Sequence, residues 1–378
     1  MKTRTIMILS AALLLCGCAD SSSTEQSDIS VTQSTATSSI PTTILEDTSE
    51  PTVEITEFSS ITATRDIRYG NSSDSLNGIV PTGFVCRGDD GELYFTDLGN
   101  TNHIFMQKNG VMTELMPRTG SCLNLWEGDL YFISNTDDPV GILIPVTNYC
   151  GDIWRYDLET GESELFYEGD VYSMMISEYG IDMRIGTQEK ETHPEYGEVT
   201  VYSMQHYRMD FDGNITEKKN TLEAFGVYYG EHELVTADDM YCWHDTLTGE
   251  YVLVVPTKDA WNISQNGEWL TWTDNGKYNI NALNIATGER KYCANMSYIY
   301  DYVWLNGELL VSSDGAIYSI GEGTAQKRFI SGIDDVTALS LFTDGKDIYG
   351  LSPNGRLLRY ELDSPLVYTP VTMWEVSE

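Results

Sequence analysis

The feature that most constrains the fold of this chain is a glycine turn followed by a short strand of aromatic and β-branched residues. Its clearest form is GELYFTD, which begins at Gly91. A period of about 40 to 50 residues with one set of strands per repeat is typical of β-propellers. The sequence therefore predicts an all-β fold, a β-propeller of about seven four-stranded blades. The later turn glycines are Gly128, Gly180, Gly230, Gly267, Gly307 and Gly345, at spacings of 37, 52, 50, 37, 40 and 38 residues.

Each repeat carries the signals of several short strands in the same order. In the first repeat the aromatic strand is LYFTD and the third strand is HIFMQ, and Asn109-Gly110 is a dipeptide typical of hairpin turns. Apolar and aromatic residues are nearly continuous within single strands, which indicates that both faces of each blade are covered by neighbouring blades. Packing between blades then explains the 8 Trp and 24 Tyr residues, and stacking on sugars is the alternative.

Residues 1–17 are predicted to be a lipoprotein signal peptide. Lys2 and Arg4 precede an apolar run, Ile6–Leu15, which is too short for the roughly 20 residues of a membrane-spanning helix. The run ends in LCGC, which resembles the bacterial lipobox, and this resemblance implies that Cys18 is the site of lipid attachment. Acyl chains contribute about 0.8 kcal/mol per buried CH₂, so a lipidated Cys18 would anchor the protein to a membrane. An ordinary cleavage site with an incidental cysteine is the alternative.

Residues 18–64 are predicted to be a lipidated linker that is acidic and rich in Ser and Thr. Residues 19–64 carry eight acidic side chains and no basic ones, and they lack a sustained apolar period. Such a segment buries too little apolar surface to offset its ordering entropy, so we expect a disordered tether. The propeller is expected to occupy residues 65–378, and a short strand within Val53–Phe58 is expected to pair with the last blade.

The charge of the chain excludes one class of partner. The formal net charge is −36. A surface this acidic repels phosphate backbones and anionic lipid headgroups. We therefore expect no nucleic acid partner, and we expect contact with the membrane only through the lipid anchor. The simplest explanation of the charge is solubility at an exposed surface. We expect an exported, extracytoplasmic monomer.

Two segments carry a resemblance to a known family. Leu93–Asp97 (LYFTD) and Thr271–Asp274 (TWTD) resemble the YWTD repeat of low-density-lipoprotein-receptor-type β-propellers. The chain as a whole resembles bacterial lipoproteins that carry such a propeller, a family whose function is mostly unassigned. The resemblance implies that the motif aspartates link neighbouring blades, a role that falls on Asp97, Asp274 and Asp314. Because propellers of this family commonly have six blades, six is the alternative to seven.

The two longest intervals between repeats indicate a candidate binding site. Their extra residues fall between the second and third strands of consecutive repeats, in Thr136–Cys150 and Gln188–Glu198. Equivalent connections of adjacent blades emerge on the same face, and long loops on a rigid scaffold often carry function. We therefore predict a binding lip, and packing of the first loop over its own blade is the alternative. The candidate lip residues are Ile142, Leu143, Ile144, Tyr149, His193 and Tyr196.

The sequence contains none of the common motifs for catalysis or metal binding. GxSxG, HExxH, CxxC and phosphate-binding glycine loops are absent, and the five histidines are dispersed. We therefore name no catalytic residue, because the many acidic residues single out no pair, and we predict no metal site and no cofactor. A calcium site built from loop carbonyls and acidic side chains is the alternative. The cysteines that follow Cys18 are odd in number and widely spaced, which favours small buried thiols over a disulfide framework.

These observations predict an exported, membrane-anchored lipoprotein whose β-propeller binds a surface protein or a glycan. The alternative is a propeller-type enzyme that cleaves a glycan or an ester with carboxylates in the central funnel. A structural part of a surface assembly is a third hypothesis.

Overall fold

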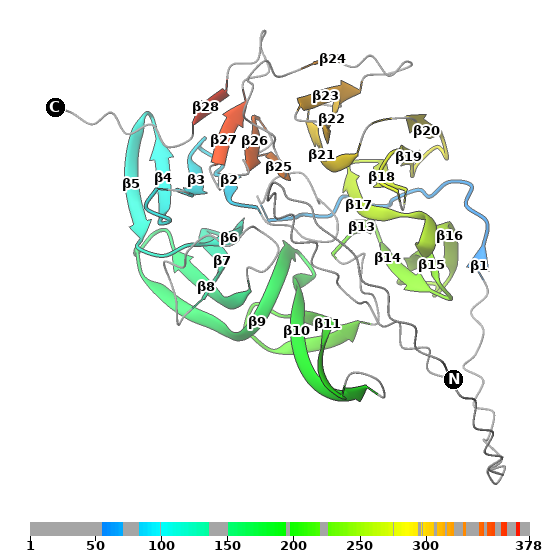
Figure 1. The fold of residues 1–378 in the computed structure, drawn as a ribbon, viewed down its shortest axis with the longest axis horizontal. Helices are drawn as coiled ribbons and strands as arrows, with labels where there is room; N and C mark the ends of the chain where they lie inside the picture. Colours follow the sequence, from blue (N-terminus) through cyan, green and yellow to red (C-terminus); the bar gives the residue numbers. More distant parts are fainter. Residues whose placement is uncertain are drawn as a thin grey trace, which may run out of the picture. The chain divides into compact units, whose positions relative to one another are not determined.

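The chain divides into two units, residues 1–50 and 51–378. Within the second unit the computed structural model describes mainly antiparallel β-sheets and one short 3₁₀ turn, Thr257–Asp259, so the all-β prediction is confirmed for this part of the chain (Figure 1). The described residues are 55–70, 83–98, 100–135, 150–193, 197–219, 226–274, 276–293, 296, 298–305, 308–313, 316–320, 328–329, 340–343, 346–351, 357–360 and 368–370.

The described strands form six sheets, four of which have four strands. The first sheet contains β2 (Val85–Arg87), β3 (Leu93–Thr96), β4 (Ile104–Lys108) and β5 (Val111–Met116). The next is a seven-stranded sheet of β6 (Ser121–Trp126), β7 (Asp129–Ser134), β8 (Gly151–Asp157), β9 (Ser163–Ser177), β10 (Gly180–His193), β11 (Gly197–Met209) and β12 (Ile215–Lys219). A five-stranded sheet follows, with β13 (Tyr228–Tyr229), β14 (His232–Ala237), β15 (Met240–Asp245), β16 (Tyr251–Pro256) and, beside β16, β1 (Ile55–Thr56).

Three further four-stranded sheets complete the described fold, each with its strands in sequence order. One contains β17 (Trp261–Asn266), β18 (Trp269–Thr273), β19 (Ile280–Asn284) and β20 (Arg290–Cys293). The next contains β21 (Ile299–Leu305), β22 (Glu308–Ser313), β23 (Ala316–Ile320) and β24 (Arg328–Phe329). The last contains β25 (Ser340–Thr343), β26 (Ile348–Leu351), β27 (Leu357–Tyr360) and β28 (Tyr368–Pro370).

Strand β9 explains why one sheet has seven strands. Its first part pairs with β8 and its second part pairs with β10, and Val171 is paired with both Gly151 and Ile185. The sheet therefore holds two groups of four strands, β6–β9 and β9–β12, that share one 15-residue strand. These groups correspond to the sequence repeats whose turns lie at Gly128 and Gly180.

The repeated glycines form turns between the first and second strands of their groups, as the sequence predicts. Gly180 lies between β9 and β10, where a Cβ atom would lie 2.4 Å from the Met209 carbonyl oxygen, so a side chain would clash with the backbone. Gly307 and Gly345 lie outside the described residues. Positive φ angles are found at Gly91 (85°), Gly128 (94°), Gly180 (121°), Gly230 (61°) and Gly267 (54°), a region that glycine enters without steric cost.

Apolar side chains join each group of strands to the next. The buried side chains on either side of a junction belong to common clusters, as expected when both faces of a sheet are covered. Residues of different sheets that belong to one cluster include Ile104 with Phe132, Met175 with Leu234, Trp243 with Leu270, Ile280 with Tyr302, Val303 with Leu341, and Phe95 with Tyr349.

Polar contacts cross the same junctions. Thr271 of the TWTD segment accepts two hydrogen bonds from β21, one at its carbonyl oxygen from the Tyr302 hydroxyl at 2.7 Å and one at its Oγ1 from Trp304 Nε1 at 2.9 Å. The guanidinium of Arg87, in β2, lies 3.4 Å from the carboxylate of Asp347, next to β26. The first and the last of the four-stranded sheets along the described chain are therefore in direct contact.

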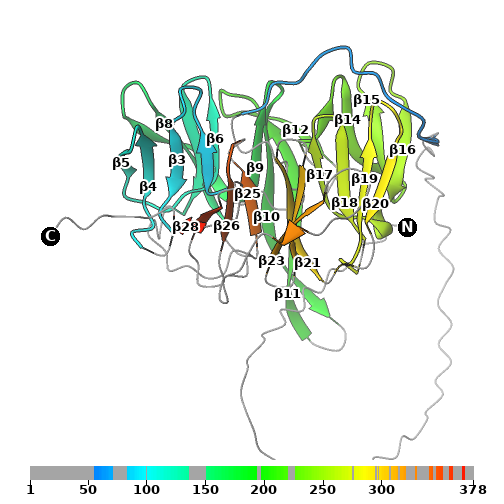
Figure 2. The same cartoon turned by 90° about the horizontal axis from the view of Figure 1, so that it is seen from above.

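Residues 55–70 form an N-terminal strap that crosses the turns of several groups of strands (Figure 2). The Ile61 amide donates to the Ile285 carbonyl at 2.9 Å, Thr64 Oγ1 donates to Glu231 Oε1 at 2.6 Å, and the Gly70 amide donates to the Ile176 carbonyl at 2.9 Å. Ile61 is buried. The predicted linker, residues 18–64, therefore overlaps the folded part of the chain from Ile55 onward.

The short strand expected within Val53–Phe58 exists, but its partner differs from the prediction. Ile55 and Thr56 pair in parallel with Tyr251 and Val252 of β16, at the outer edge of the five-stranded sheet. The last group of strands, β25–β28, is not its partner. Edge strand β16 offers unpaired backbone groups to any extended segment, so the apolar pattern of the segment alone does not select the sheet.

Candidate functional site

The second predicted lip segment, Gln188–Glu198, is a β-hairpin rather than a loop. The ladder of β10 and β11 continues from Ile181 paired with Met209 to His193 paired with Gly197. The segment continues the ladder because extended strands satisfy their backbone hydrogen bonds with each other, and Thr192 and the adjoining Val199, Thr200 and Val201 favour strands. The equivalent ladder of β14 and β15 ends at Ala237 and Met240 after six pairs.

The β10–β11 hairpin is correspondingly longer than its counterparts. It has thirteen paired positions on each strand against six in β14–β15, a difference of about 23 Å at roughly 3.3 Å per residue. Figure 2 shows its end extending past the neighbouring strands, on the side away from the N-terminal strap. We call its outer part, Gln188–His193 paired with Gly197–Tyr202, the distal hairpin.

Of the candidate lip residues, the structure describes one. His193 is the last residue of β10, at the end of the distal hairpin. The first lip segment connects β7 to β8, which are the second and third strands of their group, just as β10 and β11 are in theirs. Ile142, Leu143, Ile144, Tyr149 and Tyr196 lie outside the described residues, and their place in a lip stays a prediction.

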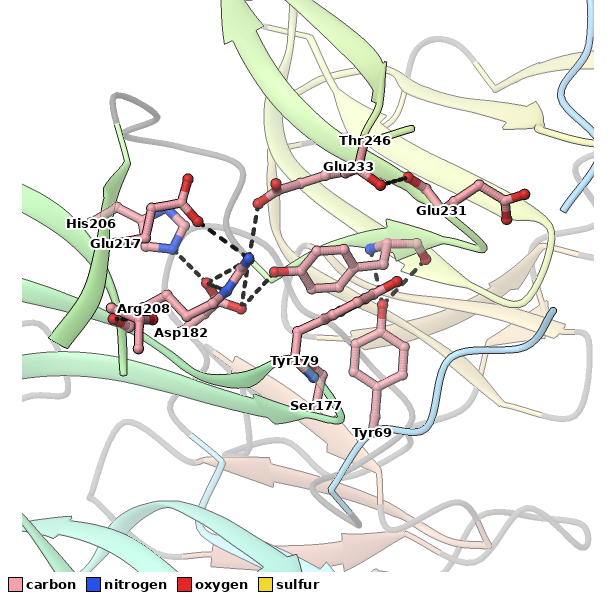
Figure 3. A network of polar contacts seen from close by, with 12 residues as sticks. Tyr69, Ser177, Tyr179, Asp182, His206, Arg208, Glu217, Glu231, Glu233 and Thr246 are labelled. Atoms are coloured by element: carbon pink, nitrogen blue, oxygen red, sulfur yellow. Dashed lines mark hydrogen bonds and ion pairs between the residues drawn. The ribbon is translucent and has the colours of Figure 1, made fainter. Parts of the chain in front are cut away.

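The inner part of the same hairpin contributes to a buried network of charged and hydroxyl groups (Figure 3). Asp182 lies on β10, and its side chain is fully buried. Its Oδ1 atom is 2.9 Å from His206 Nε2 and 3.1 Å from Arg208 Nη2, and its Oδ2 atom accepts a hydrogen bond from the Tyr228 hydroxyl at 2.7 Å. Arg208 Nη2 also lies 3.1 Å from Glu233 Oε1. We call these five residues the charge network.

The strand geometry brings these side chains together. Asp182 is the direct cross-strand partner of Arg208, and His206 lies two positions away on β11, on the same face of the sheet. Tyr228 and Glu233 come from β13 and β14, in the adjacent five-stranded sheet. The charge network therefore joins two sheets as well as two strands.

The N-terminal strap closes over one side of the charge network. The Tyr69 hydroxyl accepts from the Tyr228 amide at 2.9 Å and donates to the Tyr228 carbonyl at 3.2 Å. Burial, reinforced by the nearby carboxylate of Asp182, raises the pKa of the Tyr69 hydroxyl well above its usual range. The hydroxyl therefore stays protonated and able to donate. Arg65 Nη2 donates to the hydroxyl of Tyr179 at 2.6 Å, and the Tyr179 ring packs against that of Tyr228 at 4.8 Å.

Burial determines what this arrangement can do chemically. The side chain of Asp182 has no exposed surface, that of His206 is 1% exposed and that of Glu233 is 5% exposed. Groups closed to solvent in this way do not meet a substrate in this conformation. Their contacts satisfy one another's charges and fix β10 and β11 against β13 and β14.

Two of the three aspartates expected to link blades are described, and their hydrogen bonds organise local turns. Asp97 Oδ2 accepts from Asn100 Nδ2 and from Thr101 Oγ1, both at 2.9 Å, in the turn before β4. Asp274 Oδ1 accepts from the amide of Tyr278 at 2.9 Å in the turn before β19. The linking role stays a prediction for both, and Asp314 lies outside the described residues.

Asp301 links two sheets, and the sequence did not single it out. Its Oδ2 atom accepts from the Leu341 amide of β25 at 2.9 Å, and its Oδ1 atom accepts from the Tyr302 amide at 2.8 Å. Burial raises the pKa of Asp301 to about 7, against the opposing effect of these amides and of Lys277. The signal available in the sequence is an aspartate inside an otherwise aromatic and apolar strand, IYDYVWL.

The described cysteines are buried or partly buried thiols, as the sequence favours. Cys86, Cys122 and Cys242 are buried, and Cys150 is partly buried. Burial raises the pKa of Cys122 to about 12 and that of Cys242 to about 11, so neither is a reactive thiolate at neutral pH. Within the described ranges, three or more His, Cys, Asp or Glu side chains are nowhere grouped so that they could hold a metal ion.

Comparisons with known proteins found solved structures that are similar to this chain only at low sequence identity. No protein-family model matches the sequence, and no curated protein matches it significantly. A puromycin-hydrolysing peptidase of Mycobacterium tuberculosis is similar over 85% of this chain and 56% of its own, with 12% identity and a TM-score of 0.49. A surface component of the type-IX secretion system of Porphyromonas gingivalis is similar over 79% of this chain and 39% of its own, with 10% identity and a TM-score of 0.47. Likenesses this distant assign no activity.

Proposed function

We propose that the protein is an exported, lipid-anchored β-propeller that binds a surface protein or a glycan through the face that carries the distal hairpin. The lipid anchor at Cys18 and the signal peptide lie outside the described residues and rest on the LCGC segment. The described residues contain no helix long and apolar enough to cross a membrane. A lipid anchor is the route to the membrane that the sequence favours.

We propose a closed ring of seven four-stranded blades. Support comes from the two groups that share β9 and from the five other sheets, which give seven repeating units in the order of the glycine turns. Each unit contacts the next, and the contact of Arg87 with Asp347 connects the last unit to the first. Radial repetition of this kind leaves only short, protected sheet edges and gives a rigid scaffold.

The distal hairpin is the single observation that carries the binding function. It has thirteen paired positions where an equivalent hairpin has six. A ribbon that projects beyond its sheet contributes little to packing within the fold, so a contact outside the fold is the simplest reason for its length. The predicted loop before Cys150 belongs to the same kind of connection in the preceding repeat and would lie beside it.

The test compares the full-length protein with a hairpin-shortened variant in which Asn-Gly replaces Gln188–Tyr202. Thr187 and Ser203 are paired, so a two-residue turn can join them without changing the register. Immobilised protein is offered a cell-surface extract and a glycan array, and bound material is quantified. We expect the full-length protein to capture at least one surface component or glycan that the variant no longer captures.

A second variant, deletion of Val140–Val146, tests the neighbouring loop in the same assay. We expect it to lose capture while its thermal unfolding stays nearly unchanged. Equal capture by the full-length protein and both variants would contradict a binding site on this face. A large loss of thermal stability in the loop variant would instead mean that the loop packs on its own blade.

A further inference from the structure

Three exposed tyrosines gather near the connection between β18 and β19. Tyr278 is 52% exposed, Tyr298 is 42% exposed and Tyr300 is 38% exposed, and among the side chains whose burial the structure describes they are the exposed aromatic ones of the large apolar class. The ring centroids of Tyr278 and Tyr298 are 6.3 Å apart, and those of Tyr298 and Tyr300 are 5.2 Å apart. We call this group the tyrosine patch.

The backbone beneath the tyrosine patch is held in place by hydrogen bonds. Asp274 Oδ1 accepts from the Tyr278 amide at 2.9 Å, and the Tyr278 carbonyl accepts from the Met296 amide at 3.0 Å. The Ile299 amide donates to the Lys277 carbonyl at 2.7 Å. These bonds tie the turn before β19 to the segment before β21, so the three rings are presented by ordered backbone. Such preorganisation lowers the entropic cost of binding a ligand.

One cation lies beside the rings. Lys277 Nζ is 5.6 Å from the centroid of the Tyr298 ring, and Lys277 has a φ of 56°, which is uncommon for a residue with a side chain. Backbone conformations of this kind persist where the surrounding structure requires them, and they occur often at binding sites. The patch therefore combines flat apolar faces with an ammonium group and three phenolic hydroxyls.

The arrangement of the rings favours one class of ligand. Neighbouring ring planes are turned by 83° and 67°, so the rings do not line one continuous apolar groove of the kind that proline-rich peptides occupy. The rings pack edge to face on one another, and each tyrosine keeps more than a third of its surface exposed. Such a patch offers planar surface about the size of a sugar ring, with hydroxyl groups at its rim. The net charge of −36 disfavours polyanions and leaves a neutral ligand unaffected.

We propose that the tyrosine patch is a binding subsite for a neutral carbohydrate. The C–H face of a sugar ring packs on Tyr278, Tyr298 or Tyr300, and its hydroxyl groups bond with the phenols and with Lys277. This inference deepens the proposed function by naming a ligand class at a place separate from the distal hairpin. It depends on one part of the proposed function, namely that the protein is a binding module.

The test measures binding of neutral hexasaccharides to the full-length protein by calorimetry. The probes are β-linked hexamers of glucose, mannose, xylose and N-acetylglucosamine, with an oligogalacturonate as the anionic counterpart. We expect at least one neutral probe to bind and the anionic probe not to bind. Replacement of Tyr298 and Tyr300 together by Ala should weaken binding about tenfold or more, whereas Tyr298→Phe keeps the ring and should change affinity by less than about threefold.

Controls separate the patch from the fold and from the hairpin. Leu247→Ala removes a side chain that is 79% exposed and lies outside the patch, so it should leave affinity unchanged. Tyr278→Ser, at the most exposed ring, provides a single change should the double variant unfold at a lower temperature. The hairpin-shortened variant should still bind the sugar, because the two sites are separate.

Several results would overturn the proposal. They are failure of every neutral hexasaccharide to bind at millimolar concentration, unchanged affinity in the folded tyrosine variants, and binding of a proline-rich decapeptide at the patch in place of the sugars. If the sugar affinity is lost in the hairpin-shortened variant but not in the tyrosine variants, the patch proposal is wrong and the hairpin proposal stands.

Discussion

The β10–β11 hairpin has two halves that differ in their surroundings. In the inner half, Ile181, Asp182, Met183 and Arg184 are all buried, and the opposing strand supplies His206 and Arg208 of the charge network. The distal hairpin continues the same ladder past the neighbouring strands (Figure 2). Gly186 lies between the halves, where a Cβ atom would come within 2.2 Å of the Tyr172 ring. One pair of strands thus serves the interior of the fold at one end and projects from it at the other.

This difference between the two halves shows how a buried network can fix the direction of a projecting hairpin. A one-residue slip of β10 against β11 would move Asp182 to the other face of the sheet, away from its partners, so the buried charges favour a single register. The ladder carries that register outward to the distal hairpin. We infer that the charge network costs desolvation energy but sets the direction of the ribbon.

Among variants that test the difference between the two halves, Asp182→Ala is expected to lower the free energy of unfolding most. The change leaves His206 and Arg208 without their shared carboxylate, and removal of one partner of a buried ion pair typically costs about 3–5 kcal/mol. Denaturant unfolding of the full-length protein measures it. The matched control is Glu127→Ala, which removes the partner of Arg68 in an ion pair whose side chains are more than half exposed and should cost less than about 1 kcal/mol. Equal costs for both variants would mean that the inner half is not a stabilising junction.

A pH-dependent effect is expected at Asp301, which joins sheets without a direct ion pair. Its pKa, raised to about 7 by burial, lies above the usual 3.8, so its contribution to stability is complete below about pH 4 and is lost as the pH rises through 7. Asp301→Asn cannot ionise. Between pH 5 and pH 8, the free energy of unfolding of the wild type should therefore fall by roughly 2 kcal/mol relative to the variant. A pH-independent difference between the two proteins would contradict the raised pKa.

A smaller change, Tyr228→Phe, sharpens the comparison by removing one donor from Asp182. The ring remains, and the hydroxyl that donates at 2.7 Å is lost. We expect a loss of about 1–2 kcal/mol in the free energy of unfolding, since hydrogen bonds to charged groups contribute more than neutral ones. Tyr318→Phe, in β23 and outside the network, is the comparison variant. An equal loss of unfolding free energy in both variants would mean that the hydrogen bond from Tyr228 to Asp182 contributes no more than the hydroxyl of another tyrosine.

The smallest effect on stability is expected from shortening the distal hairpin. The hairpin-shortened variant keeps the whole inner ladder, so its unfolding free energy should lie within about 0.5 kcal/mol of that of the full-length protein. Thermal and denaturant unfolding measure this directly. A loss as large as that of Asp182→Ala would show that the two halves stabilise the fold together.

The sequence predicted the parts of the fold that depend on local chemistry. Glycine turns such as that at Gly180 require a positive φ and precede strands of recognisable composition, so their recurrence indicated the all-β class and the order of the strands. The sequence predicts a loop for Gln188–Glu198, because its many charged residues do not alternate with apolar residues as they do in a half-buried strand. Charge is compatible with a strand that has solvent on both faces.

The junctions between sheets could not be predicted in the same way. Asp182 and Arg208 pair across neighbouring strands, but Tyr228 and Glu233 come from another sheet. They lie far from Asp182 in the sequence, so no local sequence pattern indicates that these residues are in contact. The network depends on tertiary packing, as does the partner of Ile55–Thr56. In retrospect, charged residues inside the strands IDMRI and QHYRM were the available signal, because a charge in a covered strand needs a partner.

Hydrogen exchange along β10 and β11 in the full-length protein tests the central claim most directly. If the inner half belongs to the body and the distal hairpin projects from it, amides of Ile181–Arg184 and Gln205–Met209 should exchange only through global unfolding. Those of Gln188–His193 and Gly197–Tyr202 should exchange at least about a hundredfold faster, since an isolated two-stranded ribbon is marginally stable. Equal protection along the whole ladder would contradict the division of the hairpin into a structural half and a projecting half.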